Sequence, residues 1–417
     1  MTSEPPVTIV GGAGGHAAVL EDLQAAAAIL VGAAGDLREA DRALALASSG
    51  FAGASPAGAA SLAAAADAMA HARWGPEGTR TLEREVADVA DRLRRVAGAF
   101  LQAEGAAARH VDGWQSAARA AVEVHLGGLR LVGIYDATRR ALAGLVAVAE
   151  AGLREERLVD VSGRRVVGAQ PVRSLAHVGE LLVGLSAAKP REVVVDQVTG
   201  VDGHVSWIVT IPGTAELVSG DGEVFDARSN LELVDGGAAD AVVMVLAAME
   251  RAGVRPEQPV MLAGHSQGGL VANAIAAAKT PYEVTTVLTL GAPSGASPHH
   301  PDVHYLHVEN EPDLVPALDG ADNPRTPMVV TAVVDSRASA DHELAASSLT
   351  VAGAHGAAAY AWGLSLLDAD SSASMSAWRS HAAQFLAGET TVRTVVSQVH
   401  GREGPSVSPA WYRGSRP

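Results

Sequence analysis

A serine flanked by glycines is the strongest chemical signal in the sequence. Residues 259–274 read PVMLAGHSQGGLVANA, which places Ser266 at the centre of a Gly-x-Ser-x-Gly pattern with Gly264 and Gly268. An apolar strand-like run precedes the serine and an alanine-rich helix-like run follows it. In that setting the pattern forms a sharp strand-to-helix turn, and glycines are needed on both sides to avoid collisions. We therefore predict that Ser266 is a nucleophile presented above a β-sheet.

A serine hydroxyl is a weak nucleophile at neutral pH, so a base and an orienting acid must accompany Ser266. In chains with this turn the order is serine, acid and then histidine, each after a later strand. Asp313 is predicted as the acid because it lies in a loop after the strand-like run 304–308. Three nearby carboxylates are alternatives: Glu309, Glu311 and Asp319.

Two histidines follow the predicted strand 328–334 and could act as the base. His342 lies between Asp341 and Glu343, a polar setting that is typical of a solvated face. His355 lies in the small-residue turn AGAHGAAAY, which opens a helix and suits a side chain that projects into a site. We predict His355 as the base and keep His342 as the alternative.

Negative charge on a substrate carbonyl needs hydrogen-bond donors. The backbone N–H of Gln267 is one predicted donor, because it opens the helix after the serine. The second is expected where the strand 205–211 runs into a Pro-Gly-Thr turn. We predict Thr214 for this oxyanion hole, with Gly213 as the alternative; an ordinary strand-ending turn is the other interpretation.

These residues predict acyl transfer. Ser266 would attack a carbonyl while His355 takes its proton and Asp313 orients the imidazole, and water would then resolve the acyl-enzyme. This chemistry requires no metal and no organic cofactor.

Two other patterns contain residue types that bind ligands. The run HHPDVH at 299–304 has metal-ligand side chains, but an exposed connection between strands favours an ordinary polar loop. The run 7–17, VTIVGGAGGHA, matches a loose dinucleotide fingerprint, but a leucine repeat occupies the place of the second strand. We interpret 7–17 as a flexible leader.

The elements that must position the predicted site lie in the second part of the chain, where β-branched runs alternate with helical stretches. This alternation predicts a mostly parallel sheet with helices on both faces. Together with the turn at Ser266, it predicts an α/β-hydrolase fold. The predicted strands are 192–198, 205–211, 260–263, 284–290, 304–308 and 328–334, with 394–399 as a candidate last strand, and the helices are 235–252 and 267–279.

The first part of the chain predicts an antiparallel bundle of helices over 16–48, 57–72, 79–104, 114–126 and 128–153. Leucines recur every seven residues at Leu23, Leu30, Leu37 and Leu44, with Ala27 and Ala34 between them. A second seam has steps of four and three: Leu82, Val86, Val89, Leu93, Val96 and Phe100. The predicted domains are a helical bundle at 1–165, a hydrolase domain at 166–400 and a flexible tail at 401–417, joined by a connection near 154–170.

Composition narrows the function classes. The 417 residues carry a net charge of −16, which argues against a nucleic-acid partner, and they include no cysteine, which excludes disulfides and thiolate sites. No signal-peptide pattern and no apolar run of transmembrane length occurs. We expect a protein without a transmembrane segment that is cytoplasmic or exported by a route independent of a signal peptide.

At the residues above, the chain resembles bacterial α/β-hydrolases related to class 3 lipases. The likeness is carried by the Pro-Gly-Thr turn, by GHSQGG, by NEPDLVP at 310–316 and by His355 followed by Tyr360. It implies a serine hydrolase that acts on a small-molecule or lipid ester, with Ser266, Asp313 and His355 as its triad. The segment 215–234 or the N-terminal helices would cover the site.

The N-terminal region also resembles the helical WXG-type proteins tied to type VII secretion in actinobacteria, although Trp74-Gly75 lacks the intervening residue. This likeness implies a helical partner or secretion machinery bound through residues 16–150. Two alternatives to a free-standing hydrolase follow. One is an exported effector, and the other is an interaction protein whose hydrolase domain is secondary or inactive.

Overall fold

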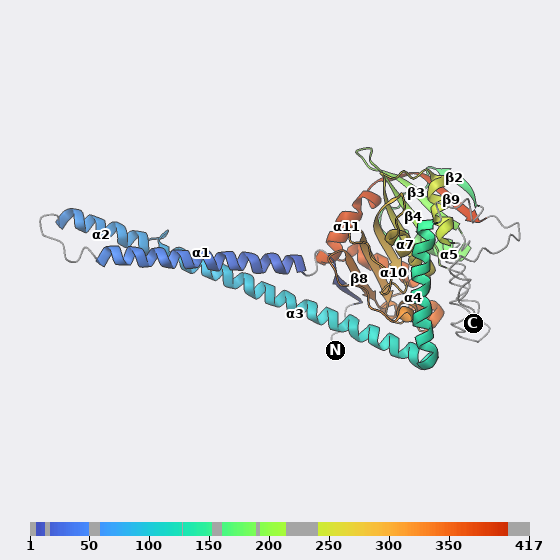
Figure 1. Cartoon of the computed structure of the whole chain (residues 1–417), viewed down its shortest axis with the longest axis horizontal. Helices are drawn as coiled ribbons and strands as arrows, with labels where there is room; N and C mark the ends of the chain where they lie inside the picture. Colours follow the sequence, from blue (N-terminus) through green and yellow to red (C-terminus); the bar gives the residue numbers. More distant parts are fainter. Residues whose placement is uncertain are drawn as a thin grey trace. The chain divides into compact units, whose positions relative to one another are not determined.

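The computed structural model describes residues 6–12, 17–49, 59–126, 128–151, 161–188, 192–213 and 241–398 (Figure 1). They belong to two compact units, His16–Ala106 and Met1–Gly15 together with Ala107–Pro417. Within these described ranges, no helix combines the length and the apolar character needed to cross a membrane.

In its described part, the larger unit is built around a nine-stranded sheet with the order β1-β8-β7-β6-β5-β4-β3-β9-β2. Strands β4 to β8 are parallel, whereas β1, β3, β9 and β2 pair antiparallel with their neighbours. The carboxyl ends of the parallel strands meet at one edge, where open α/β sheets bind ligands. The bounds are β1 Val7–Gly11, β2 Val161–Val167, β3 Glu192–Thr199, β4 Val205–Ile211, β5 Pro259–His265, β6 Glu283–Leu290, β7 His304–Asn310, β8 Val329–Val334 and β9 Glu389–Gln398.

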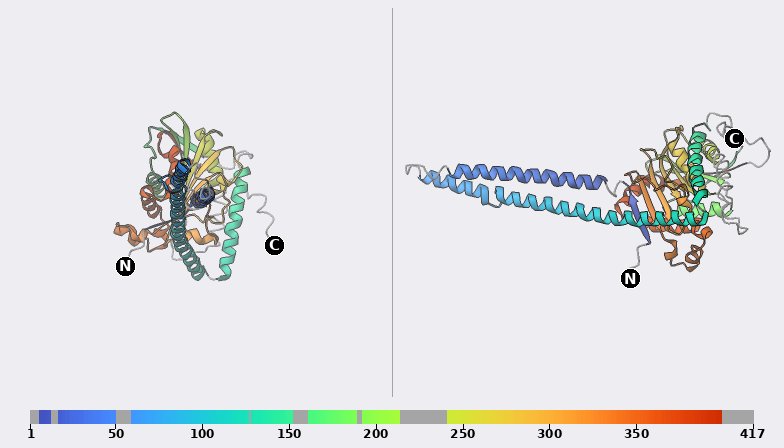
Figure 2. Two further views of the ribbon diagram at one scale, coloured as in Figure 1. Left: turned by 90° about the vertical axis from the view of Figure 1, so that its left-hand side faces the viewer. Right: turned by 60° about the horizontal axis from the view of Figure 1, so that its bottom comes forward.

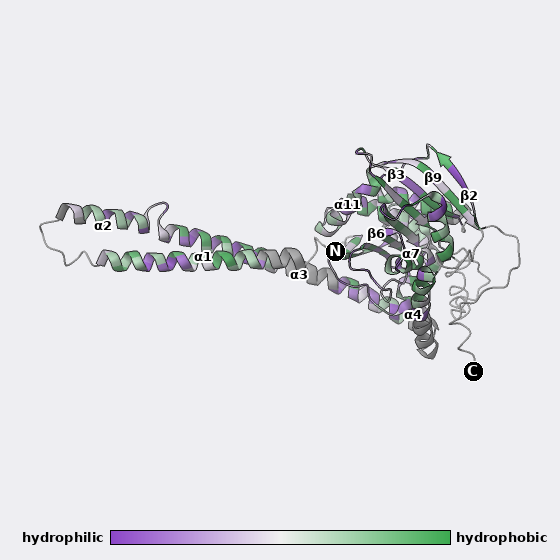
Figure 3. Cartoon of the chain, turned by 45° about the horizontal axis from the view of Figure 1, so that its top comes forward, coloured by the Kyte–Doolittle hydropathy of each residue, from purple (hydrophilic) through white to green (hydrophobic). Residues whose placement is uncertain are grey.

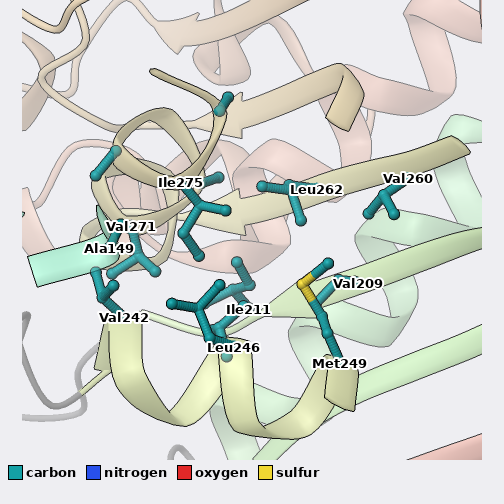
Figure 4. Packing of buried hydrophobic residues seen from close by; sticks show 14 of the residues in the cluster. Ala149, Val209, Ile211, Val242, Leu246, Met249, Val260, Leu262, Val271 and Ile275 are labelled. Atoms are coloured by element: carbon teal, nitrogen blue, oxygen red, sulfur yellow. The ribbon is translucent and has the colours of Figure 1, made fainter. Parts of the chain in front are cut away.

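Helices cover both faces of this sheet (Figure 1). On one face lie α4 (Gly128–Ala151), helical residues 241–252 and α7 (Gln267–Ala277); on the other lie α5 (Leu175–Ala188), α10 (Ala357–Ala369) and α11 (Ala373–Leu386). Side chains alternate along each strand, so one strand feeds two cores. In β5, Val260 and Leu262 join the first core (Figure 4), whereas Met261 joins the second. This arrangement confirms the predicted α/β-hydrolase fold class, preceded by a helical region.

Both edges of the sheet differ from the sequence-based expectation. The prediction of a flexible leader at 7–17 is wrong for Val7–Gly11, which forms β1 and pairs with β8. A β-branched run satisfies its backbone N–H and C=O groups by pairing, and its partner lies far along the chain. At the other edge, Val161–Val167 of the expected connection forms β2 and pairs with β9, which begins at Glu389 rather than at 394.

The predicted helices 79–104 and 114–126 are one 48-residue helix, α3 (Thr79–Leu126). Gly105 and Gly113 do not interrupt it, because a glycine inside a helix costs only about 1 kcal/mol relative to alanine. From Ala107 onward α3 belongs to the larger unit, where Val111 and Trp114 pack with Val10 of β1. The compact units therefore divide the chain at other positions than the predicted domain bounds of 1–165 and 166–400.

The smaller unit is a helical hairpin. Helix α1 (Ala17–Ser49) lies antiparallel to α2 (Ala59–Trp74) and to the first part of α3 (Figures 1 and 2). Hydrophobic and hydrophilic residues alternate along α1 (Figure 3), as in a helix with one buried side.

The seam of this hairpin is made of small residues, with Ala27 and Ala34 of α1 and Ala90 and Ala97 of α3 buried. The predicted α3 seam is wrong at two positions, because Val89 is 44% and Val96 54% exposed. Alanine lets two helices approach closely, so the buried line passes one residue beyond each valine. Asp41 closes the seam through ion pairs with Arg73 and Arg80, and the hydrogen bond from Arg73 first of all lowers the Asp41 pKa to about 2.

Candidate active site

Ser266 lies on a strained turn between β5 and α7. Its φ of 52° makes it the single non-glycine residue with a positive φ in the described part of the chain. Such a conformation costs on the order of 1–3 kcal/mol, so the surroundings must hold it. The backbone N–H of Ser266 donates to the carbonyl of Leu290 at the end of β6, 2.8 Å away.

Two glycines make this turn sterically feasible. A Cβ on Gly264 would lie 2.2 Å from the carbonyl carbon of Gly268, and a Cβ on Gly268 would lie 2.3 Å from the carbonyl oxygen of Ile211. Both distances are far below any van der Waals contact. The glycines of the sequence motif are thus explained by backbones that cross at close range.

The structure brings Ser266, His355 and Asp313 into one hydrogen-bonded line. Oγ of Ser266 lies 2.8 Å from Nε2 of His355, and Nδ1 of His355 lies 2.7 Å from Oδ2 of Asp313. The exposed fractions are 3%, 6% and 0% respectively. Since an ionised carboxylate only accepts, Nδ1 carries the hydrogen and Nε2 is left to accept from the serine.

Local structure explains the placement of Asp313. It follows β7, and its N–H donates to the carbonyl of Asn310 in a tight turn. Oδ1 accepts from the backbone N–H of Val315 at 2.9 Å, while Oδ2 accepts from the Tyr360 hydroxyl at 2.6 Å as well as from His355. Because both oxygens of Asp313 accept from fixed donors, the carboxylate is held in one orientation.

The alternative acids lie elsewhere. Glu309 is buried on the face of β7 opposite to Leu306 and Val308, and its Oε1 lies 2.7 Å from the Asn323 amide. Glu311 forms an ion pair with Arg337, and Asp319 accepts a hydrogen bond from the backbone N–H of Ala296 in the loop after β6. Burial first of all raises the pKa of Glu309 to about 8 and that of Asp319 to about 6.

The alternative base, His342, is separate from this line. It is exposed and opens the short helix α8 (His342–Ser347), which Asp341 caps. His355 instead lies between α9 (Val351–Ala354) and α10, directly before Gly356.

The predicted oxyanion hole is described in part. Helix α7 begins at Gln267, directly after the serine, so the positive end of its macrodipole lies beside Ser266. A Cβ on Gly213 would lie 3.1 Å from the Ser266 Cβ, so the end of β4 passes against the nucleophile. Thr214 and the segment 215–234 lie outside the described residues.

The histidine-rich run 299–304 is dispersed by the fold. Nε2 of His299 faces Nε2 of His307 at 2.9 Å, and Nδ1 of His307 contacts the Thr289 hydroxyl. His304 instead stacks on His381 with ring centroids 3.7 Å apart. Within the residues that the structure describes, no three His, Cys, Asp or Glu side chains are grouped to hold a metal ion.

Three contacts at the site could not be read from the sequence: those of Tyr360 with Asp313, of Asn310 with Ala354 and of His265 with His355. Asn310 and Tyr360 lie within segments that carry the lipase likeness, and His265 occupies the variable position of the motif. Their residue types were visible, but their partners lie at sequence separations that no local pattern reports.

Comparison with protein families gives a match to the PGAP1-like alpha/beta domain over residues 235–344. The matched stretch contains Ser266 and Asp313 and ends before His355. Neither curated proteins nor solved structures give a match. Over residues 235–344 the chain is thus similar to a lipase-related domain of the α/β-hydrolase type.

Proposed function

We propose that this protein is a serine hydrolase that cleaves an ester, a lipid ester among the candidates, through an acyl-enzyme on Ser266. The observation that carries the proposal is the buried line from Oγ of Ser266 through His355 to Asp313, with distances of 2.8 Å and 2.7 Å. The match to a lipase-related domain supports it.

In the proposed reaction, Oγ of Ser266 bonds to the substrate carbonyl carbon as its proton passes to Nε2 of His355. Asp313 holds the Nδ1–H tautomer and stabilises the imidazolium that forms. The carbonyl oxygen becomes an oxyanion that the backbone N–H groups of Gln267 and Thr214 are proposed to bind. The imidazolium then protonates the departing alcohol.

Hydrolysis of the acyl-enzyme repeats these steps with water. His355 takes a proton from water as the hydroxide oxygen attacks the acyl carbon, and the proton returns to Ser266 when the acid leaves. The proposed steps need no cofactor. The binding of a helical partner or of secretion machinery through residues 16–150 stays a prediction.

A fluorophosphonate probe tests the proposal, because it phosphonylates only a serine that has an activated hydroxyl. Wild-type protein should be labelled, with the adduct on the peptide that contains Ser266. Ser266→Ala should not be labelled. Ser365→Ala, which changes an exposed serine of α10, should label like wild type. A wild type that stays unlabelled, or a label that persists in Ser266→Ala, would contradict the proposal.

Unlabelled protein can also be offered p-nitrophenyl esters of increasing acyl length, alone or together with the probe. Competition between each ester and the probe reports which acyl chain occupies the site. Wild type should hydrolyse at least one ester of the series, and Ser266→Ala none.

A further inference from the structure

His265 is the last residue of β5 and directly precedes the serine. Side chains alternate along a strand, so His265 faces the same side as Met261 and Ala263, which belong to the core that α10 covers. Its side chain is buried, with 7% exposed. Its ring lies 4.9 Å from the His355 ring and 5.6 Å from the Tyr360 ring, measured between centroids.

The His265 side chain forms a hydrogen bond with the backbone of His355. Nε2 of His265 lies 2.8 Å from the carbonyl oxygen of His355. A carbonyl oxygen only accepts, so Nε2 of His265 carries a hydrogen and donates it. Burial and the neighbouring His355 lower the His265 pKa to about 3, so this donor stays neutral and places no charge beside the proposed base.

This carbonyl lies at a helix end that needs a partner. His355 is the C-cap residue of α9, and Gly356 is the N-cap residue of α10. Carbonyl groups at the C-terminus of a helix have no N–H donor within that helix, so they must accept from donors elsewhere. The preceding carbonyl, that of Ala354, accepts from the Asn310 amide at 2.8 Å.

The successive carbonyls of Ala354 and His355 are therefore held from two different strands. Asn310 ends β7, the strand that leads to Asp313, and His265 ends β5, the strand that leads to Ser266. Each strand thus fixes both a proposed triad member and the backbone that carries the third.

We propose that His265 is a positioning residue that holds the His355 imidazole between Ser266 and Asp313 by its hydrogen bond to the His355 carbonyl. This inference rests on the proposed serine hydrolase function. His265 does not touch the reacting atoms. Without the bond, the His355 carbonyl loses its link to β5, and the Nε2–Oγ distance is no longer set by the end of that strand.

Three variants test this role. His265→Gln keeps an N–H donor at similar reach, whereas His265→Phe and His265→Leu remove it with and without a ring. His304→Phe is the matched control, since it changes a partly buried histidine at the opposite end of β7. Each protein is compared for its thermal melt, for kcat and KM on p-nitrophenyl butyrate, and for its rate of fluorophosphonate labelling.

We expect His265→Phe and His265→Leu to lose kcat on the order of 10²-fold with little change in KM, because a displacement of about 1 Å has an effect of this size. His265→Gln should stay within about tenfold of wild type, and His304→Phe should match wild type. Equal losses in the Gln, Phe and Leu variants would overturn the hydrogen-bond role. So would a folded Phe or Leu variant with the wild-type kcat.

A second readout does not depend on activity. In protein with ¹⁵N-labelled histidine, the Nδ1–H of His355 that bonds to Asp313 should give a far-downfield proton signal, assigned by its absence in His355→Asn. We expect the signal to persist in His265→Gln and to broaden through solvent exchange in the Phe and Leu variants. An unchanged signal in all three overturns the positioning role, whereas inactivity of wild type on probe and ester would count against the proposed function alone.

Discussion

The Tyr360 hydroxyl lies 2.6 Å from Oδ2 of Asp313. Burial and the neighbouring carboxylate raise the Tyr360 pKa well above its usual value, so the hydroxyl keeps its proton and donates it. This oxygen of Asp313 is also the one that faces Nδ1 of His355. Tyr360 therefore withdraws part of the negative charge that would otherwise act on the imidazole alone.

Tyr360→Phe should lower kcat on p-nitrophenyl butyrate by roughly tenfold with little change in KM, because Oδ2 of Asp313 then loses one of the donors that orient it toward His355. Steady-state kinetics with this ester provide the measurement. Tyr305→Phe is the control, because the buried Tyr305 hydroxyl accepts from the His300 N–H away from the site. A folded Tyr360→Phe variant with the wild-type kcat would exclude this role.

Asp313→Asn should lower kcat on the order of 10³- to 10⁴-fold with a folded protein and a similar KM, because an amide no longer enforces the Nδ1–H tautomer. Steady-state kinetics with the same ester provide the test. Asp302→Asn, at an exposed loop position, should match wild type. If Asp319→Asn caused the full loss while Asp313→Asn stayed active, the assignment of the acid would be wrong.

Gly264→Ala should abolish fluorophosphonate labelling and lower the melting temperature, because its Cβ would lie 2.2 Å from the Gly268 backbone. Gly184→Ala is the matched control, since a Cβ at this position of α5 meets nothing within 4 Å. A helical glycine in open space gains about 0.4–1 kcal/mol on replacement by alanine, so the control should melt slightly higher. Wild-type labelling and melting in Gly264→Ala would refute the crossing of backbones at the turn.

Glu309 should make the protein less stable as the pH rises. Its pKa is about 8 in the folded chain, mainly because of burial, against 4.5 for a free glutamate. Between these values the unfolded chain releases a proton that the folded chain keeps. The contribution of Glu309 to the free energy of unfolding therefore falls with rising pH, by about 1.4 kcal/mol per unit, and levels off above pH 8.

Urea denaturation of wild type and Glu309→Gln at pH 5 and pH 8 measures this effect. Buried histidines such as His265, whose pKa is lowered to about 3, raise stability over the same range in both proteins, so the comparison of the two proteins isolates Glu309. From pH 5 to pH 8, wild type should gain less stability, or lose more, than Glu309→Gln, because the amide cannot ionise. The same change in stability in both proteins would contradict the raised pKa of Glu309.

The sequence by itself determined the features that depend on neighbouring residues. The glycines around Ser266 require the turn, and the change from heptad spacing to short β-branched runs predicts a helical region followed by a mostly parallel sheet. Such signals are local, because backbone conformation and side-chain periodicity act over a few residues. The order of strand ends also pointed to Asp313 and His355, which the structure places beside Ser266.

Tertiary structure alone decided what depends on distant partners. Val7–Gly11 becomes a strand only because β8 offers an open edge, and the burial of Ala90 rather than Val89 on α3 depends on what packs against that helix. Likewise, nothing near His265 or Tyr360 in the sequence indicates that one holds the His355 carbonyl and the other holds Asp313. Their roles depend on contacts between segments that only the folded sheet brings together.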